Sequence, residues 1–566
     1  MSEPVWILPR LNKDVSVLSK EGGIPVSLAR ILINRDINNW QKAHNFFYGT
    51  LDDLHDPYLM DGMQAAVERI GKAASNREKV IIFGDYDVDG ILSVVILMRA
   101  LESVGIDVDY YIPDRLKDGY GIKPEYIRIV KQREASLAIS VDCGIKALEF
   151  VREAEKIGVD VIITDHHQPG EILPEALAVL NPAVSSSGYP DKNLAGIGVV
   201  FKLIQAILKK EGKASVLPHY LKLVSIGTIA DIVELQNENR ILVKFGLKAL
   251  ENVANKGLKS LLEVCGLKGN KVNTGDVGFK IGPRINAAGR LGKAELSVKL
   301  FFSDSVEESK NLALRLDGLN AERQEVEKKT LKQAVCRVED KLLHERYKLL
   351  ILGCEGWHRG VIGIVASRLK ENFNRPVILF VYKDGIAYGS GRSIKEFSLI
   401  NCLQQAKNCL LNFGGHPMAV GCELSFNKMD SFKQAVNIYA DNMIQQEDLE
   451  KKIHIDTKIN FNDIDAKFLD MLSLLSPFGM GNPRPVFLTE NVEIVTEPIK
   501  IKGRHIKALV RNDGIVFEAI GWGKGDWKDR LFKGDRISIV YSLNFSEYLG
   551  EERLYLNMED IKPFPA

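Results

Sequence analysis

The sequence predicts an α/β protein with a doubly wound parallel sheet in its first third and a small β-barrel near its far end. Two observations predict this fold class. Between residues 79 and 181, short apolar runs alternate with segments of helical spacing, which is typical of a parallel sheet covered by helices. From about residue 455 onward, apolar and polar residues alternate in strand fashion, which is typical of an antiparallel barrel.

Five apolar runs account for the expected parallel sheet. Each run is short and rich in β-branched or other apolar residues, as a buried strand would be. The segments between the runs carry helical spacing. The runs cover residues 79–84, 106–113, 137–142, 159–165 and 176–181.

Acids and imidazoles stand where several of these strands end. A single Asp after a strand is more often a helix cap than a ligand. Several such residues indicate more, because parallel strands end at one edge of the sheet, where open α/β sheets bind ligands. The residues are Asp85, Asp87 and Asp89 after the first run, Asp142 at the end of the third, and Asp165, His166 and His167 at the end of the fourth.

The stretch FGDYDVDG at residues 83–90 also resembles the start of a calcium-binding EF-hand loop. Position 12 of such a loop should be a bidentate Glu, but here it is Ile96. The loop should also follow a helix, whereas this one follows the β-branched run KVIIFG. These two differences exclude an EF-hand.

A cluster of four or more Asp with His suits divalent metal ions. Carboxylate oxygens favour Mg²⁺ or Mn²⁺, and a histidine among them favours Mn²⁺ without excluding Mg²⁺. Two such ions can bind a phosphoryl oxygen, generate hydroxide and stabilise the leaving oxygen. The sequence therefore predicts a two-ion site for the hydrolysis of phosphate esters or phosphoanhydrides.

Composition sets the remaining limits. A chain of 566 residues predicts three or four domains, and a net charge of +1 means that any surface for a polyanion must be local. The seven cysteines form no C-x-x-C pair, which favours reduced thiols over disulfides or zinc. The start MSEPVWILPRLNKD lacks the pattern of a signal peptide, and the longest apolar run, at 91–98, is too short to span a bilayer. We expect a cytoplasmic protein without a membrane partner.

Four segments, in chain order, resemble the motifs of the DHH phosphoesterase superfamily, in which Asp165-His166-His167 is the namesake tripeptide. They are DYDVDG (85–90), SVDCGI (140–145), TDHHQPG (164–170) and SIGTIADIVEL (225–235). Later segments resemble the RecJ family of single-stranded-DNA exonucleases. These are GPRINAAGRLGKAE (282–295), LDGLNAERQEVE (316–327), GWHRGVIGIVASRL (356–369), GSGRS (389–393) and FGGHPMAVGCEL (413–424).

The resemblance implies roles for individual residues. Asp142 would bridge two Mn²⁺ or Mg²⁺ ions, Asp85 would either ligate or shape the loop, and His167 would contact the scissile phosphate. Without the resemblance, Asp231 would be read as a helix cap. The implied metal ligands are Asp87, Asp89, Asp142, His166 and Asp231.

A second group of residues would bind the DNA. Ser390 and Arg392 offer a hydroxyl and a charged fork, the groups that hold a terminal phosphate, and the resemblance adds Arg115 to this 5′-phosphate pocket. By themselves, the glycine turns around Ser390 and Gly414 are weak phosphate signals. Further substrate contacts implied by the resemblance are Arg284, Arg290, Gly414, Gly415 and His416.

The expected domains follow from the motifs and from changes in composition and in the apolar–polar pattern along the chain. Residues 296–345 are rich in Glu, Lys, Leu and Arg and predict one long helix. Between Lys500 and Arg536 there are ten Lys or Arg against five Asp or Glu, with Trp522, Trp527 and Phe532 among them, which favours single-strand binding on an OB-type barrel. The expected boundaries are 1–48 for an N-terminal extension, 49–250 for the DHH domain, 251–345 for a helical connector, 346–454 for the DHH-associated α/β domain and 455–566 for the OB domain.

The resemblance implies a 5′ to 3′ exonuclease that degrades single-stranded DNA to 5′-mononucleotides in DNA repair and recombination. Its implied partners are single-stranded DNA, a single-strand-binding protein and a helicase. A phosphodiesterase of short oligoribonucleotides and a non-catalytic replication scaffold are the alternatives. The presence of all the expected ligands disfavours the scaffold.

Overall fold

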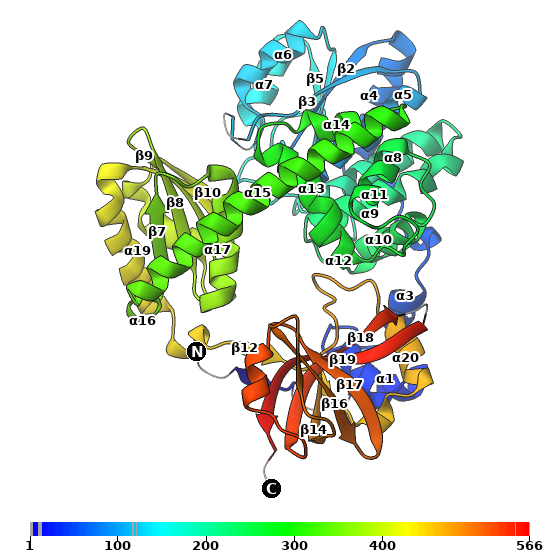
Figure 1. The fold of residues 1–566 in the computed structure, drawn as a ribbon. Coiled ribbons are helices and arrows are strands. Elements are labelled where there is room, and N and C mark those ends of the chain that lie inside the picture. The colour runs from blue at the N-terminus through cyan, green and yellow to red at the C-terminus, as the bar shows by residue number, and fades with distance from the viewer. Residues whose placement is uncertain (1–3, 10–13, 116–117, 120, 549–550, 565–566) are drawn as a thin grey trace. The chain divides into compact units, whose positions relative to one another are not determined.

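The computed structural model describes residues 4–9, 14–115, 118–119, 121–548 and 551–564. The chain divides into two compact units (Figure 1). One, here called the sheet unit, comprises residues 55–233 and 245–450. The other, here called the barrel unit, comprises residues 1–54, 234–244 and 451–566.

The first sheet of the sheet unit is wholly parallel and matches the five predicted runs. Its strands lie in the order β3-β2-β4-β5-β6. Strand order reverses between β2 and β4, which makes the sheet doubly wound and places a ligand-binding switch point there. The predicted fold class is therefore confirmed. The strands are β2 (Lys79–Gly84), β3 (Asp107–Tyr111), β4 (Leu137–Val141), β5 (Asp160–Thr164) and β6 (Ala178–Leu180).

Helices cover both faces of this sheet. On one face, Phe83 and Ile163 pack in a core with Phe150 of α7 (Leu148–Lys156) and Val130 of α6 (Ile127–Gln132). On the other face, α5 is buried almost all round, because further helices pack over it. The helices that pack over α5 (Val88–Ser103) are α8 (Gly196–Lys210) and α9 (Leu221–Ala230), and α4 (Met63–Asn76) packs against α8.

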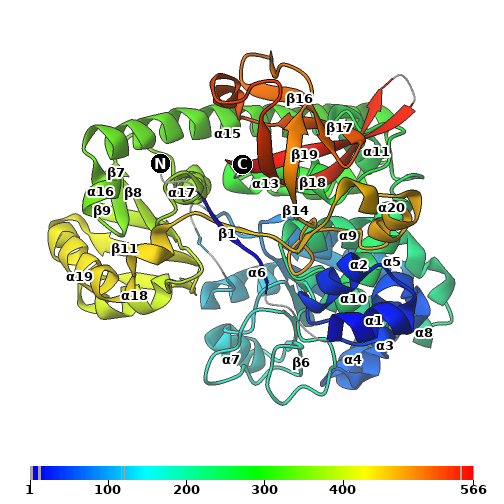
Figure 2. The same cartoon turned by 90° about the horizontal axis from the view of Figure 1, so that it is seen from below.

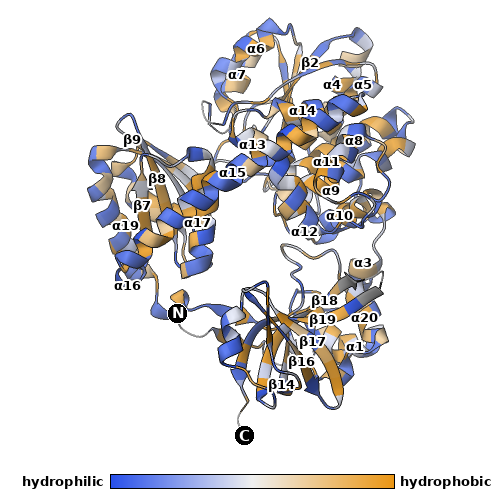
Figure 3. Cartoon of the chain, in the orientation of Figure 1, coloured by the Kyte–Doolittle hydropathy of each residue, from blue (hydrophilic) through white to orange (hydrophobic). Residues whose placement is uncertain are grey.

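The second sheet of the sheet unit is mixed, with strand order β10-β11-β9-β8-β7. Only the β7–β8 pair among its described pairings is parallel. One face packs on α17 (Arg359–Phe373), and the other on α18 (Leu399–Gln405) and α19 (Met429–Met443). Figure 3 shows β7 and β8 as hydrophobic ribbons. The strands are β7 (Leu350–Cys354), β8 (Val377–Lys383), β9 (Ile386–Arg392), β10 (Asn412–His416) and β11 (Ala419–Ser425).

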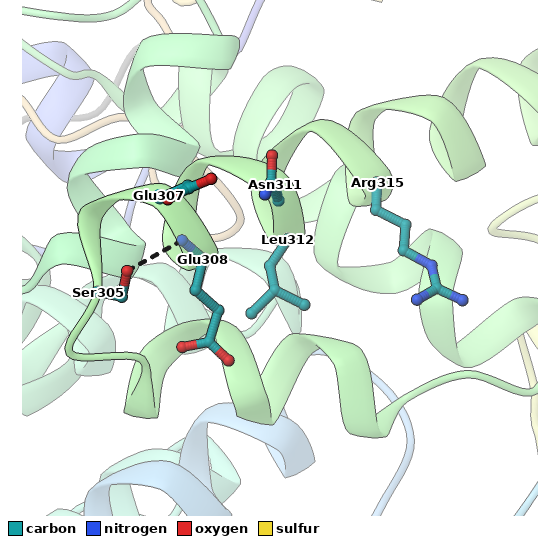
Figure 4. A pocket seen from close by; sticks show the side chains of 6 residues that line it. All are labelled: Ser305, Glu307, Glu308, Asn311, Leu312 and Arg315. Carbon is teal, nitrogen blue, oxygen red and sulfur yellow. Dashed lines mark hydrogen bonds between the residues drawn. The ribbon is translucent and has the colours of Figure 1, made fainter.

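A helical segment connects the two sheets. The helix predicted over 296–345 is instead three helices, α14, α15 and α16, with breaks at 303–305 and 341–342. Ser305 caps the second helix by accepting a hydrogen bond from the Glu308 backbone N–H at 3.3 Å, and Figure 4 shows this cap beside an open depression lined by Glu307 and Arg315. The Ser303 hydroxyl donates to Glu308 as well. The elements are α11 (Lys256–Val264), α12 (Thr274–Asp276), a π-helix (Val277–Ile281), α13 (Gly282–Arg290), α14 (Glu295–Phe302), α15 (Val306–Asp340) and α16 (Leu343–Arg346).

The barrel unit has the predicted OB topology. Strands β14, β16 and β17 follow one another, β17 pairs in parallel with β19, β19 pairs with β18, and β18 returns to β14. The β14–β16 pairing closes the barrel, as in OB-folds. The strands are β14 (Phe487–Ile494), β16 (His505–Asn512), β17 (Ile515–Gly521), β18 (Arg536–Tyr548) and β19 (Glu551–Pro563).

The N-terminal helices belong to the same unit, a placement that the sequence did not reveal. Leu18 and Phe47 share one hydrophobic core with Phe468 and the barrel residues Phe487 and Ile539. Figure 2 shows these helices and α20 in the same part of the unit. They are α1 (Asp14–Gly22), α2 (Val26–Ile33), α3 (Trp40–Tyr48) and α20 (Ala466–Ser473).

A buried arginine holds this unit together from α10 (Asn237–Ala249). The Arg240 guanidinium is 3.7 Å from the centroid of the Phe46 ring and donates hydrogen bonds to several backbone carbonyls. Burial, and then the charge of Arg35, lower the pKa of Arg240 to about 9. The accepting carbonyls belong to Phe46 (2.8 Å), Leu474 (2.7 Å), Leu475 (3.0 Å), Ser476 (2.7 Å) and Pro477 (3.4 Å).

Among the described residues, no helix is both long enough and apolar enough to span a membrane. All seven cysteines are free, which agrees with the expectation of reduced thiols.

Candidate active site

The acids and histidines singled out in the sequence meet at the carboxyl edge of the parallel sheet. Ligand atoms of each of three groups lie within 4.8 Å of one another. Asp142 and His166 each belong to two groups, so the three groups form one continuous cluster. The groups are Asp85, Asp87 and Asp142; Asp89, His166 and Asp231; and Asp142, His166 and His167.

The loop after β2 places its acids by tight local packing. Asp87 caps α5 by accepting a hydrogen bond from the Gly90 N–H at 3.1 Å, so the cap expected for a lone Asp is also present here. A Cβ at Gly90 would lie 2.5 Å from the carbonyl oxygen of Asp85, and only glycine avoids this clash. Asp89, in the first turn of the helix, accepts from the N–H groups of Gly196 (2.8 Å) and Ile197 (2.9 Å) at the start of α8.

Asp142 has a strained backbone. Its φ of 58° lies in the left-handed region, which a non-glycine residue adopts at a cost. A Cβ at Gly196 would lie 2.5 Å from the Asp142 Oδ1, so the glycine makes room for the carboxylate. Asp142 Oδ1 is 3.2 Å from His166 Nε2, which in turn is 3.5 Å from Asp231 Oδ2.

Asp165 organises the two histidines and was not assigned a role from the sequence. Its Oδ1 accepts from the N–H groups of His166 (2.8 Å) and His167 (3.0 Å) and lies 2.7 Å from His167 Nδ1. Its Oδ2 accepts from the Ile145 N–H at 2.9 Å. Burial opposes ionisation of Asp165, but the His167 contacts outweigh it and lower the pKa of the carboxyl. The signal available in the sequence was its place directly before two histidines.

Repulsion and burial raise the pKa values of the clustered acids. Burial, and then the charge of Asp87, raise the pKa of Asp85 to about 8. Burial, followed by neighbouring carboxylates, holds the pKa values of Asp89 and Asp142 well above their usual range. For Asp231, burial is again the first cause of the raised pKa. Negative charge at this edge therefore lacks enough compensation from the protein itself.

Several buried atoms of the cluster make no hydrogen bond within the described part of the chain. Buried polar atoms are nearly always hydrogen-bonded, so a group of unpartnered ones in a single place indicates a missing ligand. Carboxylate oxygens and an imidazole nitrogen are a donor set that suits Mn²⁺ or Mg²⁺. The residues therefore fit divalent ions. The atoms are Asp85 Oδ1, Asp142 Oδ1, His166 Nε2 and Asp231 Oδ2.

The predicted 5′-phosphate pocket consists of arginines that repel one another. Arg392 donates to the Gly391 carbonyl at 2.7 Å and to Ser390 Oγ at 3.4 Å. Burial, and then Arg115, lower the pKa of Arg392. Burial, followed by Arg115 and other arginines, lowers the pKa of Arg290 to about 9. These positive charges are thus close to one another and suited to an anion.

The other predicted contact residues differ in their surroundings. Arg284 forms an ion pair at 2.8 Å with Asp317, a residue of α15, and this carboxylate neutralises its charge. Gly415 has a φ of 132°, and a Cβ there would lie 2.3 Å from the Ala419 carbonyl oxygen. His416 is largely exposed on β10, and its pKa is lowered by partial desolvation of the ring and then by the nearby His167.

The aromatic residues predicted to face DNA on the barrel differ in their exposure to solvent. Trp522 and Phe532 are 49% and 54% exposed. Trp527 is 9% exposed and belongs to the core, so its expected role as a stacking surface is wrong. Lys524 lies over its ring at 5.0 Å. Alternation alone could not distinguish these side chains, because Trp527 lies in a 3₁₀ turn (Gly525–Asp529) rather than on a strand.

The fold and the acid cluster together define a metal-dependent phosphoesterase of the DHH class. The DHH family, N-terminal domain, matches residues 79–228, and the DHHA1 domain matches residues 346–442. The RecJ OB domain matches residues 455–560. The single-stranded-DNA-specific exonuclease RecJ of Bacillus subtilis is 37% identical over 98% of this chain and 70% of its own length. That of Escherichia coli is 33% identical over 95% of this chain and 96% of its own. The chain belongs to the RecJ family.

Solved structures agree with this assignment. The crystal structure of RecJ in complex with Mn²⁺ from Thermus thermophilus superposes with a TM-score of 0.85 at 29% identity, over 99% of this chain and 80% of that one. The Mg²⁺ complex of the same protein superposes with a TM-score of 0.78 at 26% identity, over 99% and 79%.

Proposed function

We propose that this chain is a metal-dependent exonuclease that degrades single-stranded DNA from 5′ to 3′ and releases 5′-mononucleotides in DNA repair and recombination. The acid cluster with its unpartnered buried atoms carries this proposal. RecJ relatives named as single-stranded-DNA-specific exonucleases support the choice of substrate. Nothing found in the chain favours an oligoribonucleotide phosphodiesterase or a non-catalytic scaffold.

Two Mn²⁺ or Mg²⁺ ions would occupy the acid cluster. Asp85, Asp87 and Asp142 would hold one ion, with Asp142 shared between both positions. Bound there, such ions supply Lewis acidity and activate water for phosphodiester hydrolysis. The residues that would hold the other ion are Asp89, His166 and Asp231.

His167 would contact the scissile phosphate. Its Nδ1–H donates to Asp165, which fixes the ring orientation and leaves Nε2 for the substrate. Burial lowers the pKa of His167, but the hydrogen bond and charge of Asp165 outweigh it and the net shift is upward. A proton on the ring lets His167 donate to a phosphate oxygen as negative charge develops there.

The arginine pocket would set the direction of degradation. A two-ion site accepts a phosphodiester in either strand direction, so polarity requires recognition of one strand end. A terminal phosphate carries more charge than an internal one, and bonds from Arg to phosphate are charge-assisted. Ser390, Arg392, Arg115 and Arg290 offer those groups near the acids, and Gly414, Gly415 and His416 would line the approach.

The barrel would hold the strand rather than cleave it. Exposed Trp522 and Phe532 offer faces for base stacking, and the surrounding basic residues can neutralise phosphates. An enzyme that needs single strands depends on unwinding of the duplex, so a helicase and a single-strand-binding protein are the partners that we propose. Such work places the protein in the cytoplasm.

One assay tests the proposal. The protein is incubated with Mn²⁺ and with 5′- or 3′-labelled single strands and duplexes of equal length. We expect single strands alone to be degraded, with mononucleotides released first from the 5′ label. Loss of the 3′ label first, or equal degradation of duplex, would contradict the proposal.

A further inference from the structure

Phe279 lies on a π-helical turn and is the most exposed large apolar side chain among the described residues, at 84%. Its neighbours on the same turn, Val277 and Ile281, are completely buried. The turn is therefore anchored from one side while the phenyl ring faces solvent. A π-helix is an uncommon local structure that is frequent at functional sites.

The helix that follows this turn, α13, packs against the backbone segments that carry the acid cluster. A Cβ at Gly282, the first residue of α13, would lie 3.1 Å from the Val277 carbonyl oxygen, 3.7 Å from Ala230 Cβ and 4.0 Å from Val88 Cγ2. Ala230 directly precedes Asp231, and Val88 stands between Asp87 and Asp89. Further along α13, a Cβ at Gly289 would lie 2.1 Å from the Tyr86 carbonyl oxygen. Both ends of α13 therefore contact the segments that position the acids.

A second exposed apolar residue lies just after the end of α9. Ile232 follows Asp231, is 65% exposed and has a φ of 62°. A β-branched residue rarely adopts this left-handed conformation, and such strain tends to occur at functional sites. The chain thus presents apolar side chains to solvent beside its most polar site. A single exposed apolar residue needs no explanation. Two of them beside the acid cluster, Phe279 and Ile232, do need one.

Cationic groups accompany the ring. Lys280 follows Phe279 and pairs with Asp276 at 2.7 Å, with 47% of its side chain exposed. Arg284 donates to the Lys280 carbonyl at 2.8 Å, so this arginine lies against the same turn. An exposed aromatic ring with cations around it is what proteins use to bind single strands, because bases stack on the ring and phosphates contact the cations.

We propose that Phe279 stacks on a nucleobase of the bound single strand and holds the strand in register beside the acid cluster. The proposal rests on the proposed function and adds to it a contact with a base rather than with the terminal phosphate. It makes Phe279 a positioning residue. The ring takes no part in cleavage.

The test combines a protein variant with a modified substrate. Wild type, Phe279→Ala and Phe279→Trp are compared on 5′-phosphorylated single strands in which one abasic site is moved along the first several positions. We expect Phe279→Ala to lower kcat/KM on the unmodified strand by on the order of ten- to a hundredfold. We expect Phe279→Trp to restore most of the activity, because the ring face is kept.

The abasic series supplies the decisive readout. At the position where the base meets the ring, wild type should lose activity, whereas Phe279→Ala should lose nothing further. Equal abasic profiles for the two proteins would overturn the proposal, even if the variant were slow. This result would indicate an apolar contact within the protein or with another protein.

Two controls separate this proposal from the proposed function. Phe426→Ala removes a phenyl ring that is 52% exposed on a turn after the second sheet and should leave activity unchanged. Binding of Mn²⁺, measured as a rise in melting temperature, should be equal in wild type and Phe279→Ala. If wild type fails to degrade single strands at all, the proposed function fails. If wild type is active but the abasic profiles coincide, only the stacking inference fails.

Discussion

Two buried charged sites, one in each unit, are compensated to different degrees. In the barrel unit, the Arg240 guanidinium is surrounded by backbone carbonyls that accept its hydrogen bonds. In the sheet unit, Asp85, Asp142 and Asp231 each retain a buried oxygen without a partner. Burial penalises both kinds of charge, yet only the first is compensated within the chain. We interpret the hydrogen-bonded arginine as a structural residue and the acids with unpartnered oxygens as ligand-binding residues.

The largest effect that this comparison predicts is for Asp142→Ala. Removing the carboxylate shared by two ligand groups should lower exonuclease activity by at least about a thousandfold, because several kcal/mol of transition-state stabilisation are lost. The melting temperature without metal should stay the same or rise, since a repelling buried acid is gone. Labelled single strands with Mn²⁺ measure the first and thermal unfolding the second.

The matched control for this variant is Asp107→Ala. Asp107 is an exposed acid at the opposite end of the same sheet, so both measurements should match wild type. An Asp142→Ala protein with near wild-type turnover would refute the assignment of the acid cluster.

The second effect is on stability, for Arg240→Met. Removing the guanidinium leaves its carbonyl partners buried and unpaired, and we expect the barrel unit to lose about 3–5 kcal/mol of unfolding free energy. Tryptophan fluorescence in denaturant measures this, because Trp6, Trp40, Trp522 and Trp527 all belong to the barrel unit.

Arg511→Met is the control for Arg240→Met. Arg511 pairs with Glu493 at 2.8 Å on the surface of the same barrel, where such pairs are worth about 0–1 kcal/mol. If both variants unfold at the same denaturant concentration, the carbonyls around Arg240 do not stabilise the unit.

A smaller effect is expected for Arg392→Ala. Arg392 is a half-buried arginine with other arginines nearby, so we group it with the acids, as a charge available to a ligand. A charge-assisted bond to phosphate is worth roughly 1.5–3 kcal/mol, so the preference for 5′-phosphorylated over 5′-hydroxyl strands should fall about ten- to a hundredfold in kcat/KM. Rates on the two strand types at one salt concentration give the ratio.

Arg368→Ala provides the reference for that ratio. Arg368 pairs with Glu327 at 2.5 Å and is 56% exposed, so its loss should not change end preference. An unchanged ratio in Arg392→Ala would mean that the 5′ end is recognised elsewhere.

The smallest effect concerns Ser305→Ala. The depression beside this residue contains acids, and the Ser305 hydroxyl caps α15 there by accepting from the Glu308 N–H (Figure 4). We expect a loss of about 1 kcal/mol in stability of the sheet unit and no change in activity. Ser305→Asp should keep the cap and restore stability. A loss of activity in Ser305→Ala without loss of stability would show that the depression has a function.

Local pattern was enough to predict the sheet and the acids. The run KVIIFG and the acids after it are contiguous, and the rule that parallel strands end at one edge brings Asp85, Asp142 and His166 together. The role of Asp165 was less visible, because hydrogen bonds to backbone N–H groups leave no signature in composition. The break at 303–305 was missed because Ser and Asp within a polar segment look like surface helix.

Packing between distant segments could not be predicted. The N-terminal helices meet the barrel strands more than 400 residues later in the sequence, and no pattern within a single window indicates such a partner. The same limit hid the burial of Trp527 and the carbonyl partners of Arg240, which come from a loop at 474–477.

The barrel unit's shared core also determines the order in which the protein can be made. Phe47 leaves the ribosome 440 residues before Phe487, with which it shares that core, a delay of about 20 to 90 seconds at roughly 5–20 residues per second. During that interval, the apolar sides of α1, α2 and α3 have no barrel to cover them. Chaperones that bind apolar surface therefore have their longest opportunity at the first fifty residues. The yield of folded protein should therefore depend on translation speed between residues 48 and 487, because synthesis of that stretch sets the length of the interval.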